Sequence, residues 1–590
     1  MLIINPNAQC ASYFTEPSSP THKQYLALRL FFADGHTAEQ VAKVTGYSKS
    51  TVYSMVRDFK EKLDSGKEDP FFKEVRAGRK QIDHKGEIED KVIDLRKKYF
   101  SVPDIQVAMD AQGHRLSVYS IDKILKDAGF ARLPRRDEQF KSDVVSSYEP
   151  KLEAPIARSL SQEYDMAFTT QLAGLLCMLP HIVKHGVDKI IEGSPYPETR
   201  EISRVSSILS FIALKLSGIK RYSADDAWCM DRGMGLFAGL NVLPKTAWFS
   251  SYSSAITRDM NMSFLKKLQS TWAGSGLLSD TVNLDFTTIP YWGDDDPFEN
   301  NWSGKRGKAL ASIQALLAQD PENGIICYGD TTVRHDRQDN AALEFLDFYH
   351  SNKRVDQQLK YLVFDSKFTT YGNLSKLDRD GIKFITIRRR SKNLVNYING
   401  IDDSRWKKIK VQKDNGKSRQ VTVFEESDTL KDYDGIIRQV FIKDNGKTKP
   451  AIIMTNDHDI SLGELVRKYS RRWLVETEIA EHIDFFHLNR NASGIVVKVD
   501  FDLTMTILAH NLYRLFCQDF PGYSHCEAQT IFDKFVSAPG RVSIDDRIIS
   551  VMIKRKRSLP ILLESMNGFR ELAYSWLDDR SVIFSADSTT

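Results

Sequence analysis

Three residues of unlike chemistry are spaced so that they share one face of a helix. Tyr469, Arg472 and Glu476 follow one another at i, i+3 and i+7, in a stretch predicted to be helical from Ser461 to about His487. That face would present a phenol, a guanidinium and a carboxylate together. The alternative is an ordinary ion pair between Arg472 and Glu476 on a solvated face. Acidic residues elsewhere in the chain favour the chemical interpretation.

Two aspartates supply the further acids that such chemistry needs. Asp285 lies inside a predicted strand, and Asp365 directly follows another. With Glu476 they offer three carboxylates, the oxygen ligands that suit Mg²⁺ or Mn²⁺ and not zinc. Two such ions about 4 Å apart can activate an attacking oxygen and stabilise a leaving one in phosphodiester transfer. We therefore expect Asp285, Asp365 and Glu476 to bind two Mg²⁺ or Mn²⁺ ions, since no Ser/His/Asp spacing or Gly-rich phosphate loop competes.

Other acids compete for the same role. Asp330 follows the third predicted strand and is the second candidate for the first acid of the site. The run Asp294-Asp295-Asp296 is predicted to be a solvated loop. Asp285 is preferred because its strand is the first of the predicted sheet.

The elements around these acids follow a recognisable order. The hydrophobic pattern predicts three strands, a helix, a strand, a helix and a strand, at 282–289, 309–318, 325–328, 340–352, 361–364, 371–377 and 384–387. This is the order of the ribonuclease H-like fold, in which the first and fourth strands are neighbours. That adjacency would place Asp285 beside Asp365, and a late helix packing on the sheet would bring Glu476 to them.

The remaining chain surrounds this core, and the fold class expected is multidomain α+β. Turn signals at Asp414-Asn415-Gly416 and Asp444-Asn445-Gly446 predict β-hairpins in an inserted segment. The expected organisation is a linker at 137–165, a helical subdomain at 166–280, the first part of the core at 281–390, a β-rich insertion at 391–458, the return of the core at 459–520 and a C-terminal helical tail at 521–590.

Residues 1–136 read as two tandem helix-turn-helix units. In the first, Thr37 caps a helix that Gly46 ends, and Ser48 caps the next. In the second, Ser117 caps the last helix. The exposed first turns of these two helices offer polar groups suited to base edges and phosphates: Lys49, Ser50 and Tyr53 in the first unit, and Tyr119, Ser120 and Lys123 in the second. A plain helical hairpin is the alternative for either unit.

Three short blocks resemble a known family. Leu284-Asp285-Phe286-Thr287-Thr288, Val363-Phe364-Asp365-Ser366 and Tyr469-x-x-Arg472-Trp473-x-x-Glu476 are similar to the acidic blocks of bacterial insertion-sequence DDE transposases that carry the Tyr-Arg-Glu-Lys signature. The resemblance covers about residues 166–520. It implies that Asp285, Asp365 and Glu476 bind the metals and that Tyr469 and Arg472 contact DNA phosphate near the cut. One departure stands out, because the signature expects a Lys at position 483, where this chain has Ile. His482, His487 or Arg490 is a candidate to supply a cation nearby.

Composition is that of an ordinary globular protein and excludes few functions. The whole chain carries a formal charge of +4, whereas residues 1–136 hold 23 Lys and Arg against 18 Asp and Glu, an excess that favours DNA contact there. The six cysteines show no Cys-x-x-Cys pair, so we expect reduced thiols. The most apolar run, Ala167 to Val183, is interrupted by polar residues and Pro180, which favours a buried helix over a membrane span.

These observations lead to one functional hypothesis with two rivals. We expect a DNA transposase that binds the ends of its mobile element, cuts them by metal-dependent hydrolysis and joins the 3′ hydroxyls to target DNA. Its partners would be double-stranded DNA and a second protomer in a homodimeric synaptic complex, with no membrane. No secretory signal is visible, so we expect a bacterial cytoplasmic, nucleoid-associated protein. The rivals are a catalytically inactive, transposase-derived DNA-binding regulator and a ribonuclease H-like nuclease without strand transfer.

Overall fold

The structure is a computed structural model. It describes residues 15–65, 71, 87–97, 100–128, 130, 156–160, 166–220, 228–291, 298–303, 307–352, 359–368, 370–412, 418–443, 450–488 and 495–587. The chain divides into two compact units, Met1–Lys151 and Leu152–Thr590. The turns predicted at Asp414-Asn415-Gly416 and Asp444-Asn445-Gly446 lie outside the described residues, as does the run Asp294-Asp295-Asp296.

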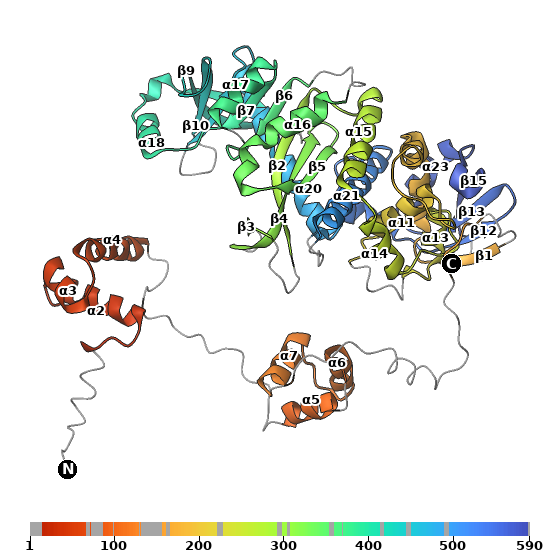
Figure 1. The fold of residues 1–590 in the computed structure, drawn as a ribbon, viewed down its shortest axis with the longest axis horizontal. Helices are drawn as coiled ribbons and strands as arrows, with labels where there is room; N and C mark the ends of the chain where they lie inside the picture. The colour runs from red at the N-terminus through yellow and green to blue at the C-terminus, as the bar shows by residue number, and fades with distance from the viewer. Residues whose placement is uncertain are drawn as a thin grey trace. The chain divides into compact units, whose positions relative to one another are not determined.

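The described residues of the first unit form two bundles of three helices each (Figure 1). The predicted caps are present: Thr37 and Gln40 form a capping box, and Gly46 ends the helix in the left-handed region at φ 70°. Ser117 caps the last helix of the second bundle through the N–H of Ser120. The helices are α2 (Pro20–Phe32), α3 (Ala38–Thr45), α4 (Lys49–Ser65), α5 (Glu87–Lys97), α6 (Val102–Ala111) and α7 (Val118–Asp127).

The second unit is built around a ten-stranded mixed sheet. Its first five strands in sequence are β2 (Thr281–Pro290), β3 (Asn300–Ser303), β4 (Lys308–Asp320), β5 (Ile325–Val333) and β6 (Tyr361–Phe364), followed by β7 (Lys383–Ile387). In space β5 pairs with β4, and the order continues β4-β2-β6-β7. The pairs β2–β4 and β4–β5 are antiparallel, whereas β2–β6 and β6–β7 are parallel. The short β3 was not predicted, so the strands predicted as first and fourth are β2 and β6, and their adjacency is confirmed.

The inserted segment extends this sheet beyond β7. Its strands are β8 (Lys407–Gln412), β9 (Ser418–Asp428), β10 (Ile437–Lys443) and β11 (Ala451–Thr455), in the spatial order β7-β11-β10-β9-β8. The β-rich character predicted for this segment is confirmed. A helix that was not predicted, α18 (Lys392–Asn399), opens it. Ile453 faces Ile387 across the β11–β7 pair, so the insertion continues the backbone hydrogen bonding of the core.

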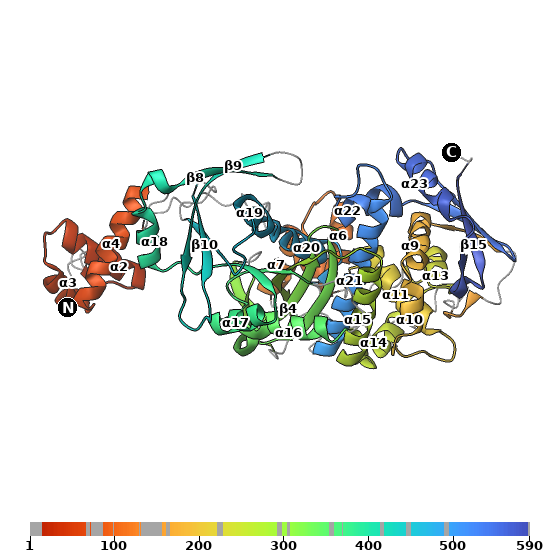
Figure 2. The same ribbon diagram turned by 90° about the horizontal axis from the view of Figure 1, so that it is seen from above.

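Helices cover the sheet on its two faces. The helices that follow the strands are α16 (Ala341–His350), α17 (Tyr371–Arg379), α19 (Leu462–Arg471), α20 (Trp473–Asp484) and α21 (Val496–Gln518). The largely buried α21 packs on β5, α20 packs on β2, and α19 lies against β7 and β8 (Figures 1 and 2). None of the described helices is long and apolar enough to cross a membrane.

The segment predicted as a helical subdomain is helical after its first strand. It contains β1 (Met166–Thr170), then α9 (Leu179–Lys184), α10 (Val187–Glu192), α11 (Arg204–Leu216), α13 (Arg232–Phe237), α14 (Thr246–Ser254) and α15 (Arg258–Gly274). The apolar stretch from Ala173 to Ile182 is buried, as expected of a core segment. It belongs to one hydrophobic core together with residues of α21 and of the ten-stranded sheet.

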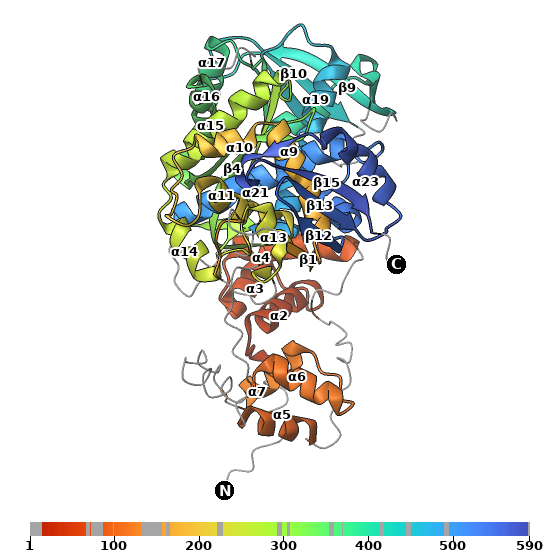
Figure 3. The same cartoon turned by 90° about the vertical axis from the view of Figure 1, so that its right-hand side faces the viewer.

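The prediction of a C-terminal helical tail is wrong. The described residues after 521 form a second sheet with β1, of order β1-β12-β13-β15-β14, together with α22 (Ala528–Ile531) and α23 (Leu559–Met566) (Figure 3). The strands are β12 (Gly540–Ile544), β13 (Ile548–Ile553), β14 (Ala573–Tyr574) and β15 (Arg580–Ala586). Burial alternates along β13 with period two, the pattern of a strand with one face in the core.

Candidate active site

Two of the three predicted acids are neighbours on adjacent parallel strands. Leu284 of β2 is in register with Phe364, the last residue of β6. Asp285 directly follows Leu284, and Asp365 directly follows Phe364, so the two acids lie beside each other at the same level of the two strands. The predicted juxtaposition of Asp285 and Asp365 therefore arises directly from the β2–β6 pairing.

An aromatic stack holds the segments that follow these acids. The rings of Phe286 and Phe368 lie 3.9 Å apart and almost parallel, at 2°. Each acid is also oriented by the backbone: Asp285 accepts a hydrogen bond of 2.9 Å from the N–H of Phe286, and Asp365 accepts one of 2.6 Å from the N–H of Ser366. Both carboxylates are thereby restrained before any ligand binds.

The helix predicted from Ser461 to about His487 is interrupted at Arg472. Ser461 caps its start as predicted, but α19 ends at Arg471 and α20 begins one residue after Arg472. In a continuous helix the carbonyl of Arg471 would accept from the N–H of Val475. Here that carbonyl accepts from the side chain of Asn283 on β2, at 3.1 Å, and Val475 donates to Arg472 at 3.2 Å. The polar contact with the sheet thus explains the break.

Arg472 links the first and third acids. Its Nη1 donates to Asp285 at 3.0 Å, and its Nη2 donates to Glu476 at 2.6 Å. The Arg472 side chain is 9% exposed, whereas that of Glu476 is 46% exposed. The Arg472–Glu476 ion pair of the alternative interpretation therefore exists, but Arg472 also bonds to the half-buried Asp285 of the sheet.

Tyr469 belongs to the same group. The guanidinium carbon of Arg472 lies 6.0 Å from the centre of the Tyr469 ring, within the range of a cation–π contact. Burial raises the pKa of the Tyr469 hydroxyl, so it stays protonated and can donate a hydrogen bond. The three residues first singled out on this helix face are thus brought together.

The electrostatics of Asp285 differ from those of a surface carboxyl. Burial raises the pKa of Asp285 to about 6, and Arg472 offsets only part of that effect. The nearby carboxylates of Glu476 and Asp365 also raise the pKa of Asp285, because a like charge disfavours the ionised form. Burial alone would lower the pKa of Arg472, but Asp285 and Tyr469 with Glu476 raise it, and the guanidinium stays charged.

Residues 279–512 match the protein family described as the transposase DDE domain. This part of the chain is a transposase DDE domain. The match begins just before β2 and ends within α21, so it includes Asp285, Asp365 and Glu476 with Tyr469 and Arg472.

Comparison with other proteins adds little to the assignment of the DDE domain. Among solved structures, the chain is similar to a piggyBac transposase in a synaptic complex with hairpin DNA, with 13% sequence identity, covering 63% of this chain and 83% of that chain. The TM-score is 0.33, which is too low to indicate a shared arrangement of the domains. No curated protein matches the chain.

The acids of the DDE domain fit divalent metal in chemistry but not in their present arrangement. Three carboxylates are the donor set that Mg²⁺ and Mn²⁺ prefer. Among the described residues, however, no group of three or more His, Cys, Asp and Glu side chains is gathered closely enough to hold a metal ion. The Arg472 guanidinium lies between Asp285 and Glu476 instead. As arranged here, the site holds an internal cation.

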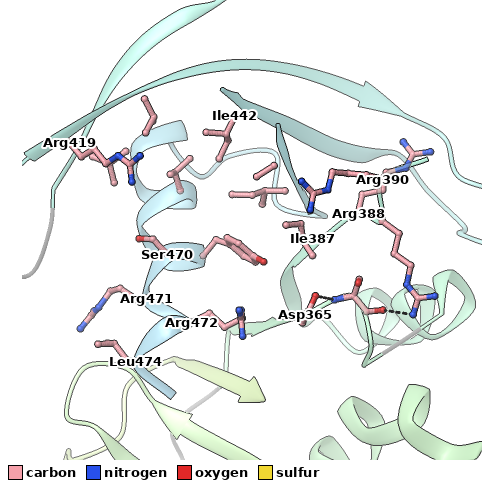
Figure 4. A pocket seen from close by; sticks show the side chains of 18 of the residues that line it. Asp365, Ile387, Arg388, Arg390, Arg419, Ile442, Ser470, Arg471, Arg472 and Leu474 are labelled. Atoms are coloured by element: carbon pink, nitrogen blue, oxygen red, sulfur yellow. Dashed lines mark hydrogen bonds between the residues drawn. The ribbon is translucent and has the colours of Figure 1, made fainter. Parts of the chain in front are cut away.

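A cavity opens beside Asp365 in the DDE domain. It has a volume of about 770 Å³ and lies between α19 and the strands of the insertion (Figure 4). Its floor is aliphatic, and six arginines line it, whereas Asp365 is the one acid among its described lining residues. The arginines are Arg388, Arg389, Arg390, Arg419, Arg471 and Arg472. The basic run at 388–390 was visible in the sequence, but its convergence with Arg419 and Arg472 was not.

Asp330, the rival for the first acid, has a structural role in the DDE domain. It is 2% exposed, and Arg258 Nη1 lies 2.9 Å from its Oδ1. The same guanidinium also reaches Asp500, at 3.4 Å. Because Asp330 is buried and neutralised by Arg258, these contacts favour Asp285 as the first acid.

His482 does not supply the positive charge that the signature expects from a Lys at position 483. Its ring is fully buried, neither ring nitrogen makes a hydrogen bond within the described residues, and burial lowers its pKa well below the usual value. His482 is therefore neutral and cannot supply a cation. His487 shares a hydrogen bond with the Gly218 carbonyl at 3.1 Å, and Arg490 lies outside the described residues.

The residues predicted to read DNA are exposed or half-buried on their bundles. Tyr53 is 54% exposed and Tyr119 is 77% exposed, so neither ring is needed in the core of its bundle. Lys49 makes a loose surface ion pair of 3.8 Å with Glu39, and Lys123 is exposed. The hydroxyls of Ser50 and Ser120 bond to the capping serines Ser48 and Ser117, each at 2.8 Å.

Proposed function

We propose that this protein is a DNA transposase that binds the ends of its mobile element, cuts them by metal-dependent hydrolysis and joins the 3′ hydroxyls to target DNA. The observation that supports this most strongly is the placement of Asp285 and Asp365 on neighbouring strands of the DDE domain, with Glu476 linked to Asp285 through Arg472. Divalent ions bound by these acids would supply activation of the attacking oxygen and stabilisation of the leaving one. The protein itself would position DNA phosphate through Tyr469 and Arg472.

The finer architecture follows the same proposal. The strand order β5-β4-β2-β6-β7 with its antiparallel second strand supports a ribonuclease H-like core. The two capped three-helix bundles support tandem helix-turn-helix units that recognise the element ends. A homodimer would hold the two ends in one synaptic complex. We place such a protein in the bacterial cytoplasm, at the nucleoid.

The deciding experiment is cleavage of a labelled duplex that carries the DNA flanking its own gene. Purified protein is incubated with Mg²⁺, Mn²⁺ or EDTA, and products are resolved on a denaturing gel. We expect cuts at the ends that require metal, followed by joining to a target plasmid. Metal-dependent cutting without joining would identify a ribonuclease H-like nuclease instead.

One rival has specific support. The Ile at position 483 and the Arg472 guanidinium between two acids are both compatible with a DNA-binding regulator that has lost catalysis. Such a regulator would bind the ends tightly and cut them under no metal. The same gel assay, run beside a filter-binding measurement, separates it from the transposase.

The raised pKa of Asp285 predicts how cleavage depends on pH. Only the ionised carboxylate can act as a ligand, and its pKa is about 6 where an ordinary Asp has 3.8. The ionised fraction is therefore full above that value and is lost as the pH falls through it. We expect the Mn²⁺-dependent cleavage rate to fall about tenfold per pH unit below about 6. End binding, measured over the same range, serves as the control, and a rate still constant at pH 5 would contradict this ionisation.

Substitutions of the exposed tyrosines test the DNA-binding assignment. We expect Tyr53→Ala and Tyr119→Ala each to weaken end binding by about tenfold, the size of one lost base or phosphate contact. Both rings are exposed, so the melting temperature should not change. Val44→Ala and Val107→Ala remove exposed apolar groups, at 62% and 70% exposure, from neighbouring helices and are the matched controls. Unchanged binding by both tyrosine variants would favour plain helical bundles.

A further inference from the structure

The cation between Asp285 and Glu476 occupies a position that metal would need. Arg472 donates one N–H to each acid, at 3.0 and 2.6 Å, and its side chain is only 9% exposed. The two charged hydrogen bonds compensate the two carboxylates. A divalent ion drawing ligands from both acids would have to displace this guanidinium. Bridging by Arg472 and metal binding therefore exclude each other.

Arg472 nevertheless has an unused donor. Its Nε–H is buried and makes no hydrogen bond among the described residues. A phosphate offers a guanidinium two oxygens in the fork geometry that Nε and one Nη match. An incoming phosphate could thus engage Nε–H together with an Nη now bonded to a carboxylate. This contact would satisfy the orphan donor and release an acid.

The adjoining cavity is suited to bring phosphate to that donor. Arg472 and Asp365 lie at one end of it, as Figure 4 shows. Arg388 is already paired with Asp428 at 2.9 Å, but Arg389 and Arg390 are exposed and bond to neutral carbonyls, each at 3.5 Å. These two keep their charge available for a polyanion. The occupant that fits is the phosphodiester backbone of DNA.

We propose that Arg472 is an internal counter-ion that keeps the acids of the DDE domain closed to divalent metal until a DNA phosphate, entering the arginine-lined cavity, takes over its guanidinium. This inference rests on the proposed function, because it assumes DNA as substrate and metal at the three acids. It adds an order of events, in which DNA binds before metal. The arrangement would prevent metal-loaded protein from cutting in the absence of its ends.

The test measures Mn²⁺ affinity by titration followed by electron paramagnetic resonance, on the full chain with and without the duplex that carries the flanking DNA. For the natural protein we expect about tenfold tighter Mn²⁺ binding with DNA, a typical coupling between two sites. For Arg472→Gln we expect that tighter affinity already without DNA, and no further gain on adding it. Arg541→Gln removes an exposed arginine from β12 and should behave as the natural protein does.

Two further variants make the result specific. Arg472→Lys keeps the charge but cannot bridge both acids, so its Mn²⁺ affinity without DNA should also rise, which covers the case in which Arg472→Gln does not fold. The double variant Arg389→Gln/Arg390→Gln should keep the weak DNA-free affinity and lose most of the gain from DNA.

The outcomes that would contradict the counter-ion role differ from those that would contradict the proposed function. If the natural protein and Arg472→Gln bind Mn²⁺ equally well without DNA, and Asp285→Asn abolishes that binding, the counter-ion role is wrong while the metal-dependent transposase stands. If neither binds Mn²⁺ at the acids even with DNA, both the counter-ion role and metal-dependent cleavage are wrong.

Discussion

Replacing Asp285 with Ala is expected to reduce end cleavage by at least about 10³-fold, the scale on which removing one essential group acts in other enzymes. Asp285 lies at the centre of the group, since it is hydrogen-bonded to Arg472 and its pKa is raised by both other acids. Without the Asp285 carboxylate, the proposed metal site would keep only the Asp365 and Glu476 carboxylates as ligands. End binding should persist, because the residues proposed for it lie in the first unit of the chain.

Asp280→Ala is the matched control for this variant. Asp280 directly precedes the same strand, and its side chain is 49% exposed, with a hydrogen bond of 2.8 Å from the Thr281 hydroxyl and a loose ion pair of 3.9 Å to Lys468. It should cut at nearly the natural rate. Rates are compared on the labelled end duplex at saturating Mn²⁺, with binding measured separately. Full cleavage by Asp285→Ala would contradict the assignment of Asp285 as the first acid, and with it the proposed three-acid site.

The second large effect concerns stability. We expect Arg258→Met to lower the free energy of unfolding of the second unit by about 3–5 kcal/mol, as removal of one partner from a buried ion pair does. Arg258 is the cation for Asp330 and Asp500, which are 2% and 3% exposed in their side chains. Asp500 would keep its hydrogen bonds from Asn261 and Thr331, but no positive charge.

Urea unfolding followed by tryptophan fluorescence measures this change. Arg29→Met is the control, because the Arg29–Asp34 pair is at the surface, with side chains 34% and 36% exposed, and is expected to contribute about 0–1 kcal/mol. A triple variant that also carries Asp330→Asn and Asp500→Asn should recover part of the loss, since no buried charge is then left unpaired. An Arg258→Met protein as stable as the natural one would return Asp330 to consideration as a functional acid.

Local pattern predicted most of the secondary structure of the core. The alternation and apolar runs around Asp285 and Asp365 predicted the strands, and the capping residues Thr37, Ser117 and Ser461 predicted where helices begin. These features depend on neighbours close in the chain, so they can be read without a partner element. The adjacency of the first two acids followed from the order of the strands.

Features that depend on distant partners could not be read in this way. The C-terminal strands were wrongly predicted as helical, although burial alternates along residues 540–553. Their sheet is completed by the distant β1, in which Phe168 lies opposite Val542, and no local pattern indicates that pairing. The helix break at Arg472 depends on Asn283, which is remote in sequence but adjacent in space. The burial of Asp330 depends likewise on Arg258, a residue that no local pattern connects to it.

By itself, then, the sequence predicted the three candidate acids, and it determined the helix face that carries Tyr469, Arg472 and Glu476 and the strand order that makes two of these acids neighbours. Only the tertiary structure decided the charge state and the partners of these groups. The physical reason is that burial and opposing charge act through space. Asp285 acquires a raised pKa and Arg472 acquires two carboxylate partners only when β2 and the α19–α20 junction are packed together.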